Sequence, residues 1–409
     1  MSTETLVSTE VAEATAMTEI AEAPAEVVEA PAETVLKFES TRSALAKALA
    51  LAIRLIPARP THPALVNFLV ETVPGGGGIY ISSFDLEVGS RQFLKCKVQN
   101  DGKALIPAKL LHDIITRLPD GEISIEVEES EYSLTAIVNT SSSHYEIRGM
   151  VANDYPELPQ IEGKGIELPK ADLKSLIRAT IASISGDVTK QVLNGMHLKI
   201  DGSRIESAST DGNRLAFALA ACEKHKPIGM TIPRQALSYL SEMIDCSETE
   251  TIHLRAEACY VELTCGNFML NARLIDGTFP NYQQLIPKKF SSSMVVERRV
   301  LLKALDRLAV VAENQGGVVE FAVKGQGQEL TLSVKEKSVG GEAGQETLLA
   351  LIQGDGLNIC FNVNYLIQGL RAIDAEEIQM NFNSSTSPAT FVPVGGSESL
   401  YLLMPIQKR

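Results

Sequence analysis

The 409-residue sequence contains no tryptophan, and aromatic residues make up only 5% of it. Tight binding of single-stranded nucleic acid uses aromatic side chains on which bases stack, so this scarcity argues against that function. No apolar run approaches the ~20 residues that span a membrane, and the first residues lack the basic and apolar regions of a secretory signal. We therefore expect a cytoplasmic protein without a membrane partner.

The signatures of metal binding and catalysis are also missing. The six cysteines form no CxxC pair and have no histidine at ligand spacing, so we expect reduced thiols, no metal site and no cofactor. The glycine-rich "PGGGG" (74–78) is not followed by the Lys-Ser/Thr of a phosphate loop, which favours a hairpin turn. The sequence contains no GxSxG or HExxH motif, and its six histidines are scattered.

Basic residues are absent from the start of the chain. Residues 1–35 contain eight Glu and no Lys or Arg, so they carry −8 of the net charge of −14 and leave −6 on the other 374 residues. This composition predicts a disordered acidic tail, either inert and solubilising or used for docking. The mildly acidic remainder argues against a protein that coats DNA, but it permits a basic surface concentrated in one place.

What the sequence does contain is a repeat of about 125 residues. Amphipathic helices are predicted at 40–54, 170–183 and 297–312, and a strand–helix–strand pattern recurs at 104–127, 230–254 and 359–382. Pro107 and Pro233 are expected to open the second helices of their copies. We predict an α+β fold of three tandem domains, 36–160, 161–287 and 288–409, each with two helices packed on antiparallel sheets.

The repeat also explains "STDGNRLAFAL" (209–219), which has the residue types of a catalytic or phosphate-binding loop. Asp211 lies 126 residues after Asp85, in a matching position between two alternating strands. Both aspartates are therefore predicted to cap their own turns through side chain–backbone hydrogen bonds. Gly212 to Leu215 distinguish the second copy.

Lys and Arg recur on most of the predicted helices although the protein as a whole is acidic. Helix faces with spaced basic residues favour a weak contact with phosphates that does not depend on sequence.

At this point the sequence resembles the bacterial β sliding clamp of DNA polymerase III from about residue 35 to the end. The specific segments are "ARPTHPAL" (58–65), "IPAKLLHDI" (106–114), "ANDYPELP" (152–159), "VLNGMHL" (192–198), "STDGNRLA" (209–216), "IDGTFPNYQQLIP" (275–287), "FNVNYLIQGL" (361–370) and "YLLMPI" (401–406). The resemblance implies a head-to-tail homodimer, a closed six-domain ring around double-stranded DNA that needs no catalytic residues of its own.

The resemblance also implies three sets of functional residues. A pocket for linear motifs of the replicative polymerase, the clamp loader and repair polymerases would be formed by Leu193, Thr210, Gly212, Asn213, Arg214, Leu215, Pro280, Gln284, Leu285, Asn362, Tyr365, Pro388, Leu402, Met404, Pro405 and Ile406. DNA would be contacted by Arg59, Lys190, Gln191, Arg42, Lys47, Lys109, Lys174, Arg178, Arg234 and Lys303. The dimer seam would contain Tyr145, Ile147, Val310 and Val311.

Some positions depart from the family pattern. Asn213 stands where His is common, Gln284 where Arg is common, and the chain ends "MPIQKR" with Gln407 at an Arg position. The preferred partner motif is therefore expected to differ.

Two alternatives are weighed against the clamp. An enzyme on the same scaffold, with Asp211, His197 or His253 as catalyst, would need acid, base and substrate groups in one cleft, and the sequence assembles no such set. A monomeric adaptor that only binds peptides would lack the ring.

Overall fold

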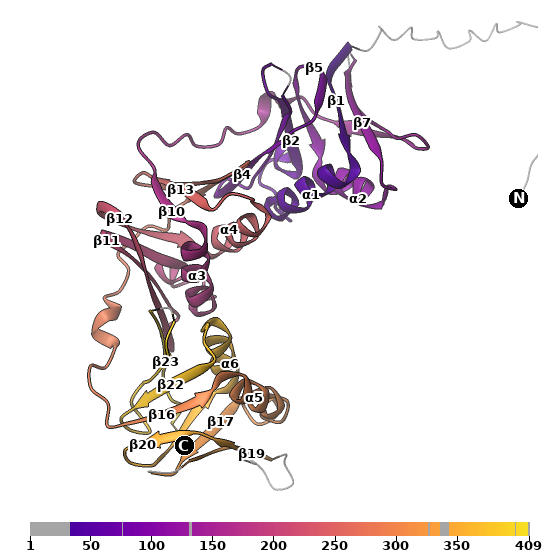
Figure 1. Cartoon of the computed structure of the whole chain (residues 1–409). Helices are drawn as coiled ribbons and strands as arrows, with labels where there is room; N and C mark the ends of the chain where they lie inside the picture. Colours follow the sequence, from indigo (N-terminus) through magenta and orange to yellow (C-terminus); the bar gives the residue numbers. More distant parts are fainter. Residues whose placement is uncertain are drawn as a thin grey trace, which may run out of the picture.

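The computed structural model describes residues 33–75, 77–130, 133–325, 328–335, 343–396 and 398–407, which form a curved arc of three domains (Figure 1). Three main clusters of buried apolar side chains, one for each domain, form the cores. The predicted α+β class with three tandem copies is confirmed. Residues 1–32 of the predicted tail lie outside the described residues, but the first strand already begins at Glu33. The predicted tail is therefore three residues too long, because Glu33 and Thr34 already pair with a neighbouring strand.

Domain I contains two helices and nine strands among its described residues. They are α1 (Arg42–Ala52), α2 (Ala108–Arg117), β1 (Glu33–Thr41), β2 (Asn67–Thr72), β3 (Ile79–Phe84), β4 (Val88–Leu94), β5 (Lys97–Asn100), β6 (Lys103–Pro107), β7 (Glu122–Glu129), β8 (Leu134–Asn139) and β9 (His144–Gly149). Helix α1 begins where Thr41 Oγ1 accepts a hydrogen bond from Ala44 N at 3.3 Å, and it buries Leu45, Ala48, Leu49 and Ala52 on one face. The "PGGGG" segment joins β2 to β3 as the predicted hairpin, with Gly76 outside the described residues.

Domain II is built from fewer and longer strands. Its elements are α3 (Lys170–Thr180), α4 (Arg234–Cys246), β10 (Ile166–Pro169), β11 (Gly195–Thr210), β12 (Arg214–Pro233), β13 (Thr251–Ala256), β14 (Tyr260–Cys265) and β15 (Phe268–Arg273). One half of the domain is built around the single long pair β11–β12, of 16 and 20 residues. The pair continues past Asp201-Gly202 because Gly202, at φ +64°, forms a bulge opposite His225 instead of a turn.

Domain III completes the arc with two helices and nine strands in its described part. They are α5 (Arg298–Glu313), α6 (Val363–Ala372), β16 (Ser292–Glu297), β17 (Val318–Val323), β18 (Glu329–Val334), β19 (Gly344–Leu349), β20 (Leu351–Gln353), β21 (Leu357–Asn362), β22 (Glu377–Phe382), β23 (Ala389–Pro393) and β24 (Ser399–Leu403).

The prolines that were expected to open the second helices of domains I and II lie one residue before those helices. Pro107 and Pro233 end strands β6 and β12, and the helices start at the next residue.

Two of the four sheets run across domain boundaries. The orders are β5-β1-β7-β8-β9, β10-β13-β14-β15-β4-β3-β2-β6, β11-β12-β24-β23-β22-β16-β20 and β19-β18-β17-β21. Strand β4 of domain I pairs with β15 of domain II, and β12 of domain II pairs with β24 of domain III, so the domains are joined by main-chain hydrogen bonds.

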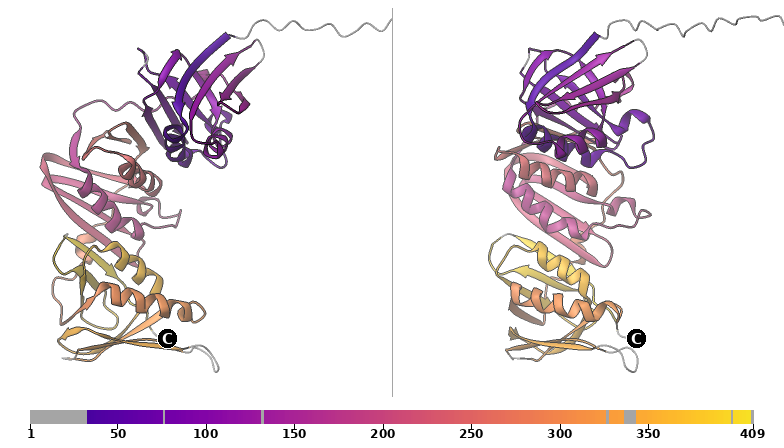
Figure 2. Two further views of the ribbon diagram at one scale, coloured as in Figure 1. Left: turned by 45° about the vertical axis from the view of Figure 1, so that its right-hand side comes forward. Right: turned by 90° about the vertical axis from the view of Figure 1, so that its right-hand side faces the viewer.

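The helices line the concave side of the arc. Contacts join them in the order α2, α1, α4, α3, α6 and α5, so neighbouring domains touch through helices as well as sheets. The view onto the concave side shows this row of helices in front of the sheets (Figure 2, right). The sheets form the outer wall.

Candidate functional site

The turn between β11 and β12 has the structure predicted from the repeat. Asp211 Oδ1 accepts hydrogen bonds from Asn213 N at 2.8 Å and Arg214 N at 3.1 Å, and Gly212 has a φ of +94°. In the sister turn, Asp85 Oδ1 accepts from the amides two and three residues later, at 2.9 and 2.6 Å. Both aspartates therefore cap their own turns.

The arginine of this turn is buried between domains II and III. Arg214 is only 7% exposed, and its Nε donates to Asp211 Oδ2 at 2.9 Å. Its Nη1 donates to Gln368 Oε1 at 2.7 Å, and the guanidinium carbon lies 4.3 Å from the centre of the Tyr365 ring. Its charge is thus largely used inside the protein.

Apolar side chains from both domains pack beside the turn. Ala208, Leu215, Phe279, Tyr282 and Leu402 form a buried cluster at this boundary, and Leu193 packs against it. Tyr282 follows the extended segment after β15, in a short 3-10 helix (Tyr282–Leu285). Its hydroxyl donates to Glu206 Oε2 at 3.1 Å, and burial raises the pKa of Tyr282.

The C-terminal segment bridges the two domains. Met404 N donates to Asn213 O at 2.9 Å, and Ile406 N donates to Cys360 O at 2.8 Å. Met404 and Ile406 themselves are 41% and 36% exposed. Leu285, which is 54% exposed, adds a further accessible apolar group from domain II.

The structure thus brings most of the predicted pocket residues to one boundary. Thr210 is buried in the turn, where its Oγ1 donates to Arg214 O at 2.6 Å. Asn362 has a structural role, because its Oδ1 caps α6 through Asn364 N and Tyr365 N. Pro280 and Gln284 are exposed, and Pro405 is half-buried.

The half-buried Pro388 follows a loop whose residues line a hollow of about 310 Å³ beside Ile406. Sequence reasoning missed Gln368, Phe279 and Tyr282. Gln368 lies one turn after Tyr365 on α6, and this spacing was the available signal for it.

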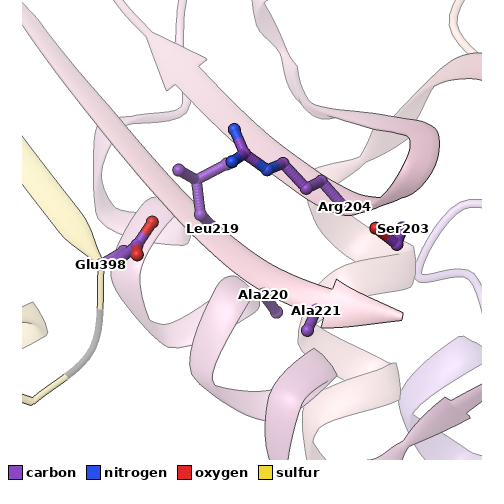
Figure 3. A pocket seen from close by; sticks show the side chains of 6 residues that line it. All are labelled: Ser203, Arg204, Leu219, Ala220, Ala221 and Glu398. Carbon is purple, nitrogen blue, oxygen red and sulfur yellow. The ribbon is translucent and has the colours of Figure 1, made fainter. Parts of the chain in front are cut away.

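A larger hollow of about 400 Å³ lies at the same boundary but does not contain the predicted residues. Figure 3 shows Arg204 extending toward Leu219 of β12, with Glu398 of domain III on the far side of β12. Two of the lining residues, Leu219 and Glu398, join domains II and III by a main-chain hydrogen bond from Leu219 N to Glu398 O at 2.8 Å. The exposed apolar residues Leu285, Met404 and Ile406 do not line this hollow.

The concave helix surface concentrates positive charge. The six helices of the described chain contain 13 Lys and Arg against 6 Asp and Glu, whereas the whole sequence contains 37 against 51. Lys47, Lys109 and Lys303 are exposed, and no ion pair joins them to a described acidic residue. Arg59 and Lys190 are exposed in loops, and the exposed Gln191 begins a short 3-10 helix (Gln191–Leu193).

Other predicted DNA contacts are engaged within the protein. Arg42 donates to the Ile115 and Thr116 carbonyl oxygens at the end of α2, and Arg234 donates to the Ile184 carbonyl. These two guanidinium groups serve as structural caps, so the structure does not favour the predicted DNA role for them.

Two further basic residues of the predicted set form ion pairs. Lys174 pairs with Asp245, and Arg178 pairs with Asp374 across the II–III boundary at 3.2 Å. Both side chains remain about half exposed, which leaves them accessible from the concave side.

The predicted seam residues differ in accessibility. Tyr145 is 40% exposed at the edge strand β9, beside Leu110 and Ile114 of α2, and Val310 is 71% exposed near the end of α5. Ile147 is 1% exposed in the domain I core, so its side chain does not reach the surface of the single chain. Val311 is half-buried.

The residues considered as catalysts lie in separate environments. Asp211 accepts hydrogen bonds within its turn, and His197 of β11 stacks on Phe279 with ring centres 4.9 Å apart. His253 lies 3.5 Å from Glu167 on the neighbouring strand, in a different sheet from His197. Within the described residues, no group of three or more His, Cys, Asp or Glu could hold a metal ion.

No helix in the described part of the chain is long and apolar enough to cross a membrane.

Comparison with known proteins shows three consecutive family matches. Models of the DNA polymerase III beta subunit match in order: the N-terminal domain over residues 36–159, the central domain over 167–281 and the C-terminal domain over 283–407.

Individual relatives align over almost their whole length. The beta sliding clamp of Synechococcus elongatus is 36% identical over 380 residues, covering 91% of this chain and 100% of the relative. That of Synechocystis sp. is 35% identical over 390 residues, covering 91% and 99%. A crystal structure of the C. crescentus beta sliding clamp, solved with polyethylene glycol bound, superposes with a TM-score of 0.84 at 25% identity, covering 91% and 99%.

Proposed function

The chain belongs to the DNA polymerase III beta subunit family, the β sliding clamps, and we propose that it acts as a ring that encircles duplex DNA. In this role it tethers the replicative polymerase, the clamp loader and repair polymerases to DNA through linear motifs. It acts without catalysis, because topological linkage replaces specific contacts. We place it in the cytoplasm with the chromosome, without a membrane partner.

The observation that carries the ring is a repeated pattern of strand pairing. Within the chain, β4 pairs with the last strand of domain II, and β12 pairs with the last strand of domain III. In domain III the strand equivalent to β4 and β12 is β19, which lies at the edge of its sheet. The last strand of domain I, β9, also lies at the edge of its sheet. Pairing β19 with β9 of a second copy would repeat the same boundary, and two such seams close a head-to-tail homodimer. Tyr145 and Val310 are the seam residues whose exposed side chains support this pairing.

The charge distribution supports duplex DNA as the enclosed partner. The concave helices are basic within an acidic protein, and Lys47, Lys109 and Lys303 are accessible there. Contacts to phosphates hold the duplex without reading sequence, and their weakness allows the ring to slide.

The II–III boundary is the proposed peptide site. Leu285, Met404 and Ile406 offer exposed apolar surface above the buried cluster of Leu215 and Leu402. This arrangement fits a partner segment with bulky apolar anchors such as Leu or Phe.

Native mass measurement and primer extension test the proposal together. We expect a species of twice the 44.2 kDa chain mass and longer polymerase products on primed circular DNA once the clamp loader is added. A monomer at micromolar concentration that still binds polymerase peptides would favour the adaptor alternative instead. Family membership supports the clamp over that alternative.

A further inference from the structure

Arg214 connects two domains through its guanidinium group. On the domain II side, Nε donates to Asp211 Oδ2, whose other oxygen holds the turn. On the domain III side, Nη1 donates to Gln368 Oε1 and the guanidinium lies over the Tyr365 ring. With 8% of the side chain exposed, little of the group is accessible to a peptide.

The domain III partners of Arg214 stand on a firmly packed helix. Tyr365 and Gln368 are three residues apart on α6, so they share one face. The next residue, Gly369, lets α6 approach β24 closely, because a Cβ there would lie 2.2 Å from Tyr401 Cε1. The Tyr401 hydroxyl in turn donates to Tyr365 O at 2.8 Å. These contacts hold α6 closely against β24. Tyr365 and Gln368, the two residues of α6 that contact Arg214, therefore have little freedom to move.

The sister boundary uses a similar contact without an arginine. Asp85 Oδ2 accepts directly from Gln235 Nε2 of α4 at 2.7 Å, so a turn of domain I is attached to the second helix of domain II. In both cases an aspartate of the repeated turn reaches the second helix of the next domain. At the II–III boundary an arginine extends the connection, and the exposed Leu285, Met404 and Ile406 belong to the same boundary.

We propose that Arg214, held by Asp211 and Gln368, is a positioning residue that sets the distance between the 211–213 turn and α6. The inference rests on the proposed peptide site. Asn213 precedes Arg214 and its carbonyl holds Met404, while Leu215 follows it in the buried cluster. Fixing Arg214 thus fixes the opening into which a partner's apolar anchors would fit, without contact between Arg214 and the peptide.

The test compares Gln368→Leu, which removes the acceptor, with Gln368→Glu, which keeps one. The probe is a fluorescein-labelled synthetic peptide that ends in Leu-Phe, and its Kd is measured by fluorescence anisotropy. We expect Gln368→Leu to raise Kd about five- to tenfold and Gln368→Glu to stay close to the wild type. The matched control is Gln235→Leu, which removes the sister contact far from the pocket and should leave Kd unchanged.

A second measurement decides the proposal independently of the peptide. Hydrogen–deuterium exchange should become faster in residues 213–218 and 399–403 of Gln368→Leu but not of Gln368→Glu. Unchanged exchange and unchanged Kd in Gln368→Leu, or equal weakening in the Gln235→Leu control, would overturn the positioning role. A wild-type protein that fails to bind the peptide would instead overturn the pocket, while the exchange result still decides the role of Arg214.

Discussion

Substitution of Val310 by aspartate should open the proposed ring without unfolding the chain. Val310 is 71% exposed in the single chain, so its side chain contributes little to the domain III core. Fully burying an aliphatic side chain contributes ~1.5–3 kcal/mol of hydrophobic free energy. Because Val310 is still largely exposed, burying it at a seam would contribute ~1–2 kcal/mol of this to dimer formation. A closed dimer contains two identical seams, so Val310→Asp removes ~2–4 kcal/mol in total, and each buried carboxylate adds to that loss.

This loss corresponds to a dimer dissociation constant about 30- to 1,000-fold higher, because ~1.4 kcal/mol is a factor of ten. Aspartate near the end of α5 costs the domain itself only ~0.3–1 kcal/mol. Sedimentation velocity over a nanomolar-to-micromolar series gives the constant, and Tm reports the fold. Val188→Asp is the matched control, because Val188 is 79% exposed in a loop of domain II away from the seam. Equal dissociation constants for the two variants would refute the placement of the seam.

Three further predictions concern DNA, pH and the repeated turn. Replacing Lys47, Lys109 and Lys303 by Ala removes up to six phosphate contacts per ring. The slope of log K for duplex binding against log salt concentration should therefore become shallower by up to about 5. An unchanged slope would exclude these lysines as DNA contacts. Burial lowers the pKa of His197, so the folded state resists its protonation and stability is lost as pH falls below 6.5. Urea unfolding at pH 7.5 and 5.5 should therefore show a larger loss for the wild type than for His197→Gln, and equal losses would contradict this assignment. Leu86 has a φ of +79°, which costs a non-glycine residue ~1–2 kcal/mol, so Leu86→Gly should match or exceed the wild type in Tm; a clear decrease would contradict this strain.

Much of the architecture could be predicted because the repeat makes separate segments support one another. Asp85 and Asp211 lie 126 residues apart, and this interval identified a shared turn before any contact was known. Period-3.6 patterning placed the first helix of each copy within a few residues of its observed bounds, and each predicted strand–helix–strand segment contains the second helix. The pairing across boundaries was not predictable from these patterns, because β4–β15 and β12–β24 join strands about 180 residues apart.

The site was less predictable because side-chain roles depend on neighbours distant in sequence. Arg214 and Gln368 are 154 residues apart, and nothing local shows that the arginine is buried against α6. Tyr145 and Ile147 have the same parity in β9, yet one lies at the border of the sheet and the other inside the core. The resemblance to the family grouped residues that meet at the II–III boundary, whereas tertiary packing decided which of their side chains are exposed.

Retention on closed and opened DNA tests the central claim most directly. The protein is loaded by the clamp loader onto a nicked circular plasmid, the complex is isolated by gel filtration, and half is linearised with a restriction enzyme. We predict that the protein stays with the circle and slides off the linear molecule, because linkage by a closed ring needs no tight contact. Equal retention on both forms, or equal loss from both, would contradict a ring that encircles DNA.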